Sequence, residues 1–87
     1  MTHKIKLHEG FADDVLSGKK PFEVRENDRG YQCGDTVVFE VVCDSIYRQA
    51  EVSKHPLNGK PYEITYVLSG WGLKNGFVAF GIRPKEE

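Results

Sequence analysis

The sequence has 87 residues, of which 39% are hydrophobic and 29% are charged. That length is the size of one small domain, and its hydrophobic content allows a thin sandwich or a small barrel but excludes a large buried ligand cavity. The 12 basic and 13 acidic residues nearly cancel, so net charge argues neither for nor against nucleic acid. A surface that binds polyanions could exist only as a local patch.

Cysteine usage and hydropathy exclude several further classes. Cys33 and Cys43 form no Cys-x-x-Cys motif and have no histidine nearby, which argues against zinc. No segment has the pattern of a signal peptide or of 18 consecutive apolar residues. We therefore expect a cytoplasmic protein with reduced thiols, no metal, no cofactor and no membrane contact. It should form a single domain over residues 1–87, with a frayed acidic tail at 84–87.

The segment HKIKLHE, residues 3–9, has the pattern of a strand. Ile5 and Leu7 alternate with lysines, which is the period of a strand with one buried face. His3 and His8 are five positions apart, so they fall on opposite faces and cannot share a metal ion. His8 could line a cleft beside the next element, or it could be an ordinary surface histidine.

The segment GFADDVLSG, residues 10–18, changes to the period of a helix. The spacing i, i+1, i+4 and i+5 places its apolar residues on one face of a helix. These residues are Phe11, Ala12, Val15 and Leu16. The spacing predicts a short helix over about residues 10–17, with Gly18 as its C-terminal cap. We expect Phe11, Val15 and Leu16 to pack against the rest of the domain.

The segment PFEVREN, residues 21–27, returns to the period of a strand. Phe22 and Val24 lie on one face, and Glu23 and Arg25 lie on the other. We expect the two apolar residues to anchor in the core and the two charged residues to line a surface. Proline at position 21 suits the start of a strand or an edge strand.

The remaining sequence reads as strands joined by turns. TVVFEVVC at 36–43 is apolar on both faces and predicts a central strand, and SIYRQAEV at 45–52 predicts a weaker one. SKHPLNGKP at 53–61 is a turn, and FVAFGI at 77–82 closes the sheet. YEITYVL at 62–68 is a strand with these residues in the core: Tyr62, Ile64, Tyr66 and Leu68.

These elements predict a mixed α/β fold that is mainly β. We expect a small β-barrel of five to six strands, with one short helix near the N-terminus. A closed barrel would remove the exposed strand edges that a chain of this size would otherwise leave bare.

The segment GKKPFEVR, residues 18–25, carries a resemblance to a known family. It fits the pattern Gly-x-Lys-x-x-Glu-x-Arg, which is similar to the signature of the ASCH domain (activating signal cointegrator homology) in the PUA-like superfamily. The order of elements over roughly residues 5–83 is also similar to a subfamily of short bacterial and phage proteins of unknown function. The resemblance implies a PUA-like barrel with a cleft lined by the motif. Members of the family are proposed to bind RNA or modified nucleobases, and a few act as enzymes.

The motif residues Lys20, Glu23 and Arg25 also suit nucleotide binding on chemical grounds. A carboxylate can accept a hydrogen bond from a base, while lysine and arginine can neutralise phosphate. Together they fit an unstacked nucleotide in RNA. The alternative is that the three charges pair with one another, as neighbouring charges on strands often do.

Five further residues are candidates for the same nucleic-acid interface. Trp71 lies between two glycines and could stack on a base or cover the core, and Tyr31 could stack as well. Arg29 could reach a phosphate, although Asn27–Arg29 also has the composition of a turn. Lys19 adds a cation beside the motif, and His8 could border the cleft.

An enzyme is the first alternative to an RNA- or nucleotide-binding module. Some ASCH relatives resemble amidohydrolases of acetylated cytidine that use a lysine, a threonine three residues on and a later glutamate. Lys20 matches the lysine, but Glu23 stands at the threonine position, which puts that activity in doubt. Ribonuclease chemistry, with Glu23 as base and Lys20 or Arg25 stabilising the phosphorane, is a second enzymatic alternative. A protein-interaction module is the third reading, since the net charge is nearly neutral.

Overall fold

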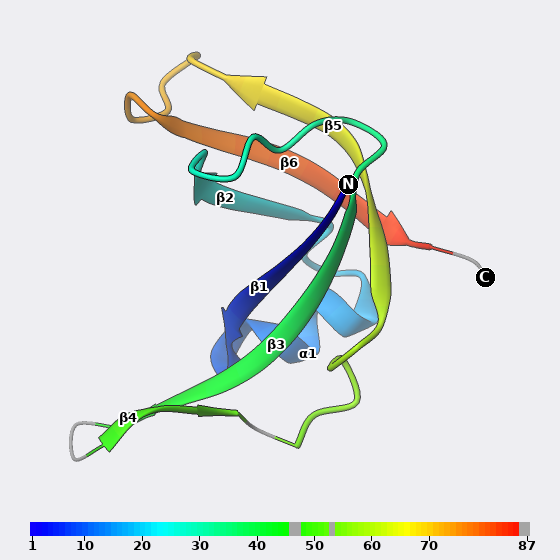
Figure 1. The fold of residues 1–87 in the computed structure, drawn as a ribbon, viewed down its shortest axis with the longest axis vertical. Helices are drawn as coiled ribbons and strands as arrows, with labels where there is room; N and C mark the ends of the chain where they lie inside the picture. Colours follow the sequence, from blue (N-terminus) through cyan, green and yellow to red (C-terminus); the bar gives the residue numbers. More distant parts are fainter. Residues whose placement is uncertain (46–47, 53, 86–87) are drawn as a thin grey trace.

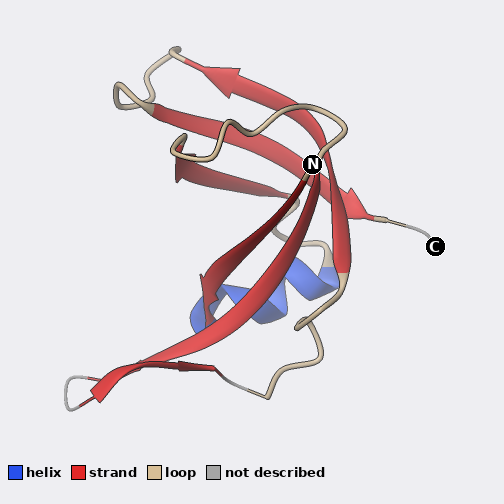
Figure 2. Cartoon of the chain, viewed as in Figure 1, coloured by secondary structure: helices blue, strands red, loops and turns tan. Residues whose placement is uncertain are grey.

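The computed structural model describes residues 1–45, 48–52 and 54–85. Its elements are mainly strands with one short helix after the first strand, as the sequence predicts (Figure 2). No helix in these ranges is long and apolar enough to cross a membrane. The elements are β1 (Thr2–His8), α1 (Glu9–Ser17), β2 (Phe22–Glu26), β3 (Thr36–Ser45), β4 (Arg48–Val52), β5 (Pro61–Ser69) and β6 (Phe77–Pro84).

The strands form one sheet in the order β1-β3-β5-β6-β2, with β4 paired to β3. β1 and β3 are parallel, and the other pairs are antiparallel. β5 joins the two halves of the sheet, because Pro61–Glu63 pairs with β3 and Tyr62–Ser69 pairs with β6. Figure 1 shows the sheet bending sharply along β5, so that β1 and β2 come round toward each other from opposite ends.

The predicted closed barrel is not formed. No strand pairing joins β1 to β2 among the described residues, so these two strands each keep an unpaired edge, and the two edges face each other. The helix α1 follows β1 and packs against β1 and β3. The chain therefore reaches β2 through a helix and a turn rather than through a hairpin, and β1 and β2 are not paired with each other.

The core is one cluster of buried side chains from β1, α1, β3, β5, β6 and two loops. β2 contributes no apolar side chain to this cluster, which is unexpected for a strand containing Phe22 and Val24. The cluster consists of Ile5, Leu7, Ala12, Val15, Tyr31, Val37, Phe39, Val41, Leu57, Tyr62, Ile64, Val78, Phe80 and Ile82.

The helix lies within a residue of its predicted position, but only part of its predicted face is buried. Val15 is buried, whereas Phe11 is 50% exposed and Leu16 is 36% exposed, so the prediction that all three pack inward is wrong. Gly18 ends the helix with a φ of 86°, and its backbone N–H donates to the Val15 carbonyl at 3.2 Å. A left-handed cap of this kind favours glycine, as predicted.

The central strand and the turn after it agree with the sequence pattern. β3 lies between β1 on one side and β5 and β4 on the other. In the turn, Leu57 is fully buried, and the Asn58 side-chain oxygen accepts a hydrogen bond from the Val41 N–H at 2.7 Å. The predicted strand over 45–52 corresponds to β4, although residues 46–47 lie outside the described residues.

A β-bulge reverses the faces of β5. Ile64 pairs with Ile82, but Tyr66 pairs with Gly81, so Thr65 is an extra residue between them. Tyr62 and Ile64 are buried as predicted. Tyr66 is 67% exposed and Leu68 is 36% exposed, so their predicted place in the core is wrong. Strict alternation cannot predict this outcome, because one inserted residue moves every later side chain to the other face.

The end of the chain is ordered further than predicted. Pro84 still pairs with Tyr62, and the Lys85 N–H donates to the Pro61 carbonyl at 3.0 Å. The predicted frayed tail therefore does not begin at residue 84. Residues 86–87 lie outside the described residues.

His3, a buried histidine of β1, forms a hydrogen bond with Asp35 in the loop that precedes β3. His3 is 4% exposed, and its Nε2 lies 2.8 Å from Asp35 Oδ2. The same carboxylate oxygen accepts from the Gln32 N–H at 3.1 Å. The hydrogen bond with His3 holds the pKa of Asp35 below its usual range, while burial acts in the opposite direction.

We predict that Asp35→Asn destabilises the fold only where the carboxylate is ionised. The folded-state pKa is lowered, so the stabilisation is complete above the unfolded value of about 3.9 and is lost as pH falls through the folded value. At pH 7 the free energy of unfolding should fall by about 1–3 kcal/mol. Urea unfolding at pH 7 and pH 2.5 measures the difference, with the exposed Asp14→Asn as a control. An equal deficit of Asp35→Asn at both pH values contradicts this role.

Candidate functional site

The two faces of β2 are the reverse of the prediction. Glu23 pairs with Phe80 and Arg25 with Val78, and both β6 partners are buried. Glu23 therefore faces inward and is only 2% exposed. Phe22 and Val24 face outward with 46% and 48% exposure, so their predicted burial is wrong.

The buried Glu23 carboxylate is satisfied by the other two motif residues. Lys20 Nζ contacts Oε2, while Arg25 donates to Oε1 from Nε at 3.0 Å and from Nη2 at 2.8 Å. A buried carboxylate is costly unless it is paired and hydrogen-bonded. Two cations on one anion leave a net charge of +1. The mutual pairing that the sequence left open as an alternative is therefore what these contacts show.

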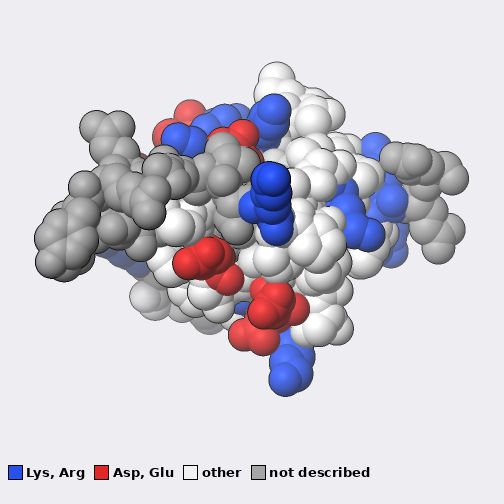
Figure 3. Space-filling model, turned by 90° about the horizontal axis from the view of Figure 1, so that it is seen from below, with Lys and Arg blue, Asp and Glu red and all other residues white. Residues whose placement is uncertain are grey.

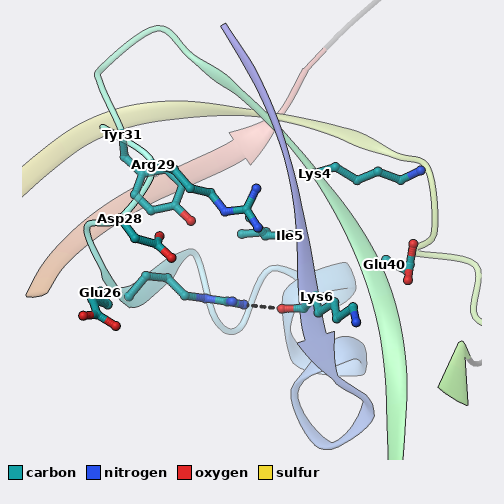
Figure 4. A pocket seen from close by; sticks show the side chains of 9 residues that line it. Lys4, Ile5, Lys6, Glu26, Asp28, Arg29, Tyr31 and Glu40 are labelled. Atoms are coloured by element: carbon teal, nitrogen blue, oxygen red, sulfur yellow. Dashed lines mark hydrogen bonds between the residues drawn. The ribbon is translucent and has the colours of Figure 1, made fainter. Parts of the chain in front are cut away.

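Arg25 also makes the contact that crosses from β2 to β1. Its Nη2 donates to the Lys6 carbonyl at 2.7 Å (Figure 4). We call the gap between the unpaired edges of β1 and β2 the seam. A side chain thus occupies a position where a closed barrel would have strand-to-strand hydrogen bonds.

Arg25 and Lys6 line two neighbouring pockets along the seam. The first, called the charged pocket, has a volume of about 500 Å³. In Figure 4 the Arg29 guanidinium extends from the loop after β2 toward β1 and Ile5. The pocket contains four cationic and three acidic side chains, so its charge is mixed. Its lining is Lys4, Ile5, Lys6, Arg25, Glu26, Asp28, Arg29, Tyr31 and Glu40.

The second, called the aromatic pocket, has a volume of about 420 Å³. Lys20 Nζ lies 5.2 Å from the ring centroids of both Phe11 and Phe22. Both rings are about half exposed, so one cation sits between two accessible aromatic surfaces. The pocket is lined by Lys6, Leu7, His8, Phe11, Lys20, Phe22, Glu23, Val24 and Arg25.

The structure brings His8 and Arg29 to the seam together with the three motif residues. His8 lines the aromatic pocket, where its Nδ1 accepts from the Gly10 N–H at 3.0 Å and caps α1. Its ring lies edge-on to Phe11, with 6.3 Å between centroids. Arg29 lines the charged pocket.

Tyr31 is part of the core and offers no free ring face. The ring is 5% exposed and packs against His3 and Phe80 at centroid distances of 4.8 and 4.7 Å. Burial raises the pKa of its hydroxyl, and the nearby Arg25 and Arg29 act in the opposite direction. The predicted stacking role is therefore not available to Tyr31, although its edge borders the charged pocket.

Lys19 and Trp71 lie outside both pockets of the seam. Lys19 is exposed in the turn between α1 and β2. Trp71 is 90% exposed in the hairpin between β5 and β6, with a φ of 53° between two left-handed glycines. Such exposure excludes the alternative that Trp71 covers the core.

Among the residues that line the seam but were not predicted as site residues are Lys4, Lys6 and Phe11. The alternation in HKIKLHE already placed both lysines on the exposed face of the first strand. Nothing local showed that this face borders the motif strand, because that proximity comes from the bend of the whole sheet.

Charges of both signs are also interspersed elsewhere on the molecule. Figure 3 shows Lys and Arg near Asp and Glu on the face seen from below, without a single large patch of one sign among the coloured residues. Across residues 1–45, 48–52 and 54–85 there is no group of three His, Cys, Asp or Glu side chains that could hold a metal ion. Cys33 and Cys43 are free thiols.

Comparison with known proteins places the chain in a family. Residues 2–82 match the family described as a domain of unknown function, DUF3850, and the chain belongs to it. It is 38% identical over 50 residues to an uncharacterised 12.9 kDa protein in the GpA 3′ region of Escherichia phage P2. That match covers 58% of this chain and 46% of the phage protein, so it spans less than half of the relative's length.

A solved structure shares the fold. The crystal structure of hypothetical protein PH0355 aligns over 98% of this chain and 100% of its own, with a TM-score of 0.60 and 18% identity. At that identity the likeness concerns the fold alone. The family match and the phage relative support the predicted similarity to small phage or bacterial proteins of unknown function.

We predict that Glu23→Gln strongly destabilises the protein. An amide cannot balance Lys20 and Arg25, so two partly buried cations lose their counter-charge. Removing one partner of a buried pair costs about 3–5 kcal/mol in the free energy of unfolding. Glu63→Gln is the matched control, because Glu63 pairs with Arg83 on the surface, where loss of a pair costs about 0–1 kcal/mol. Urea unfolding at pH 7 compares the two, and equal small losses contradict a structural role for Glu23.

Proposed function

We propose that the protein is an ASCH-like, PUA-like module whose seam binds RNA or a nucleotide. The pattern of Gly18, Lys20, Glu23 and Arg25 supports the family assignment. The observation that carries the binding proposal is the adjacency of the two pockets. One offers cations for phosphate and the other offers half-exposed aromatic rings for a base, and both share Lys6 and Arg25.

The charged pocket is suited to a small number of phosphates. Lys4, Lys6 and Arg29 are exposed side chains whose charge can contact a phosphate oxygen. Three carboxylates in the same lining repel a long run of phosphates. Binding should therefore depend on salt with a shallow slope, in contrast to that of a strongly basic RNA-binding protein.

The aromatic pocket is suited to an unstacked base. The rings of Phe11 and Phe22 offer apolar surface, and Lys20 adds a cation beside both. Stacking of bases on aromatic side chains contributes about 1–3 kcal/mol per base and tolerates any base. Leu7 and Val24 extend the apolar lining.

Glu23 acts as a positioning residue in this proposal. Both of its carboxylate oxygens are already bonded to Lys20 and Arg25, so neither is free to read the edge of a base. Its role is to hold the two cations at the seam. The same contacts make Glu23 a poor general base, and this favours binding over the ribonuclease alternative.

We expect Lys6→Ala and Arg29→Ala each to weaken binding of a fluorescein-labelled, mixed-sequence 10-nucleotide single-stranded RNA by about 1 kcal/mol or more. Each change should also lower the salt slope by up to about one unit, because one phosphate contact is lost. Fluorescence anisotropy titrations at several KCl concentrations measure both quantities.

Lys60→Ala is the matched control for these variants, because Lys60 is an exposed lysine outside the seam. It should bind RNA as the unaltered protein does. Equal affinities for all four proteins, or no binding of the RNA by the unaltered protein, would refute the proposed site. Thermal melts should show that Lys6→Ala and Arg29→Ala remain folded, since neither side chain is bonded to Glu23.

A further inference from the structure

The outer face of the sheet beside the seam is unusually apolar. Strand pairing aligns two rows across β2, β6 and β5, and their side chains share this face. The residues at the ends of the two rows are Phe22, Tyr66, Val24 and Leu68, and their exposed fractions lie between 36% and 67%. The rows are Phe22–Gly81–Tyr66 and Val24–Ala79–Leu68.

The middle strand presents small residues to this face. In the two rows β6 contributes Gly81 and Ala79, which lie between larger side chains on the neighbouring strands. A Cβ on Gly81 would lie 2.5 Å from Thr65 Oγ1, so the bulged threonine already occupies that position. The rings of Phe22 and Tyr66 stand on strands about 10 Å apart, on either side of β6.

This face is continuous with the seam, and cations lie at its edges. Phe22 and Val24 also line the aromatic pocket, so a single strand, β2, lies between the seam and the outer face. Lys20 Nζ lies 5.2 Å from the Phe22 ring. At the other end, Lys74 Nζ lies 5.7 Å from the ring of Phe77, the next β6 residue on this face. Cations beside apolar surface complement a ligand with bases and phosphates.

The size of the face argues against a stable pairing of two copies. A fully exposed aromatic side chain offers about 150–250 Å², so the exposed parts of the four end residues amount to about 300–400 Å². Stable protein interfaces bury about 800 Å² on each partner. The face is therefore too small for a stable dimer, but it is large enough for a few bases.

We propose that this outer face is a second base-binding surface, and that the ligand is a single-stranded nucleic acid of several nucleotides that passes from the seam over β2. This inference rests on the proposed function of the seam. The bases beyond the seam stack on Phe22 and Tyr66, and Lys20 and Lys74 lie near the connecting phosphates. A mononucleotide would fill only the seam.

The test uses fluorescein-labelled oligouridylates of 2, 4, 8 and 12 nucleotides in anisotropy titrations. The unaltered protein should gain affinity up to about 8 nucleotides. Tyr66→Ala should bind the 8-mer about 10-fold more weakly, in line with the loss of one stacking contact, and bind the dinucleotide unchanged. Arg29→Ala, in the seam, should weaken both. Leu16→Ala is the control for truncating a partly exposed apolar side chain elsewhere, and it should change neither.

Any of the following three outcomes would overturn the inference. If the dinucleotide and the 8-mer bind equally and Tyr66→Ala has no effect, the seam binds a nucleotide and the outer face does not. If no oligonucleotide binds, the proposed function fails as well. If sedimentation shows a dimer that Tyr66→Ala dissociates, the face is a protein interface. Circular dichroism of Tyr66→Ala confirms that the variant is folded.

Discussion

The buried carboxylate of Glu23 is the constraint on which the rest of this structure depends. It faces inward beside Phe80, and Lys20 and Arg25 bond both of its oxygens. Once Glu23 faces inward, the period of the strand places Phe22 and Val24 outside. The same orientation lets Arg25 reach the Lys6 carbonyl on the opposite edge of the sheet. One ion network thus determines both the contact of Arg25 with Lys6 across the seam and the apolar outer face.

This arrangement also explains why the sheet can stay open. A small domain with two unpaired edges risks pairing with other chains. Here the edges of β1 and β2 face each other, and one arginine side chain links them by a hydrogen bond to a backbone carbonyl. The gap between them holds the charged pocket and the aromatic pocket. The seam therefore follows from the incomplete closure of the sheet.

Much of the fold was predictable from local patterns, whereas the faces of two strands were not. Spacing placed the helix and its Gly18 cap, and the run of apolar residues placed the central strand β3. Alternation failed at Val24 because an ion network overrode the burial of apolar residues, and at Tyr66 because a bulge shifted the register. The motif residues of the site were found as a group. Their mutual pairing and the contribution of Lys6 depend on contacts between distant segments.

A double-mutant cycle between Glu23 and Arg25 tests the central claim most directly. Urea unfolding would give the free energies of the unaltered protein, Glu23→Gln, Arg25→Met and the double variant. If the two side chains form one buried unit, the double variant should be about as stable as the worse single variant, with a coupling energy of about 2–3 kcal/mol. Additive losses, with a coupling within about 0.5 kcal/mol of zero, would show that the network does not hold the seam together.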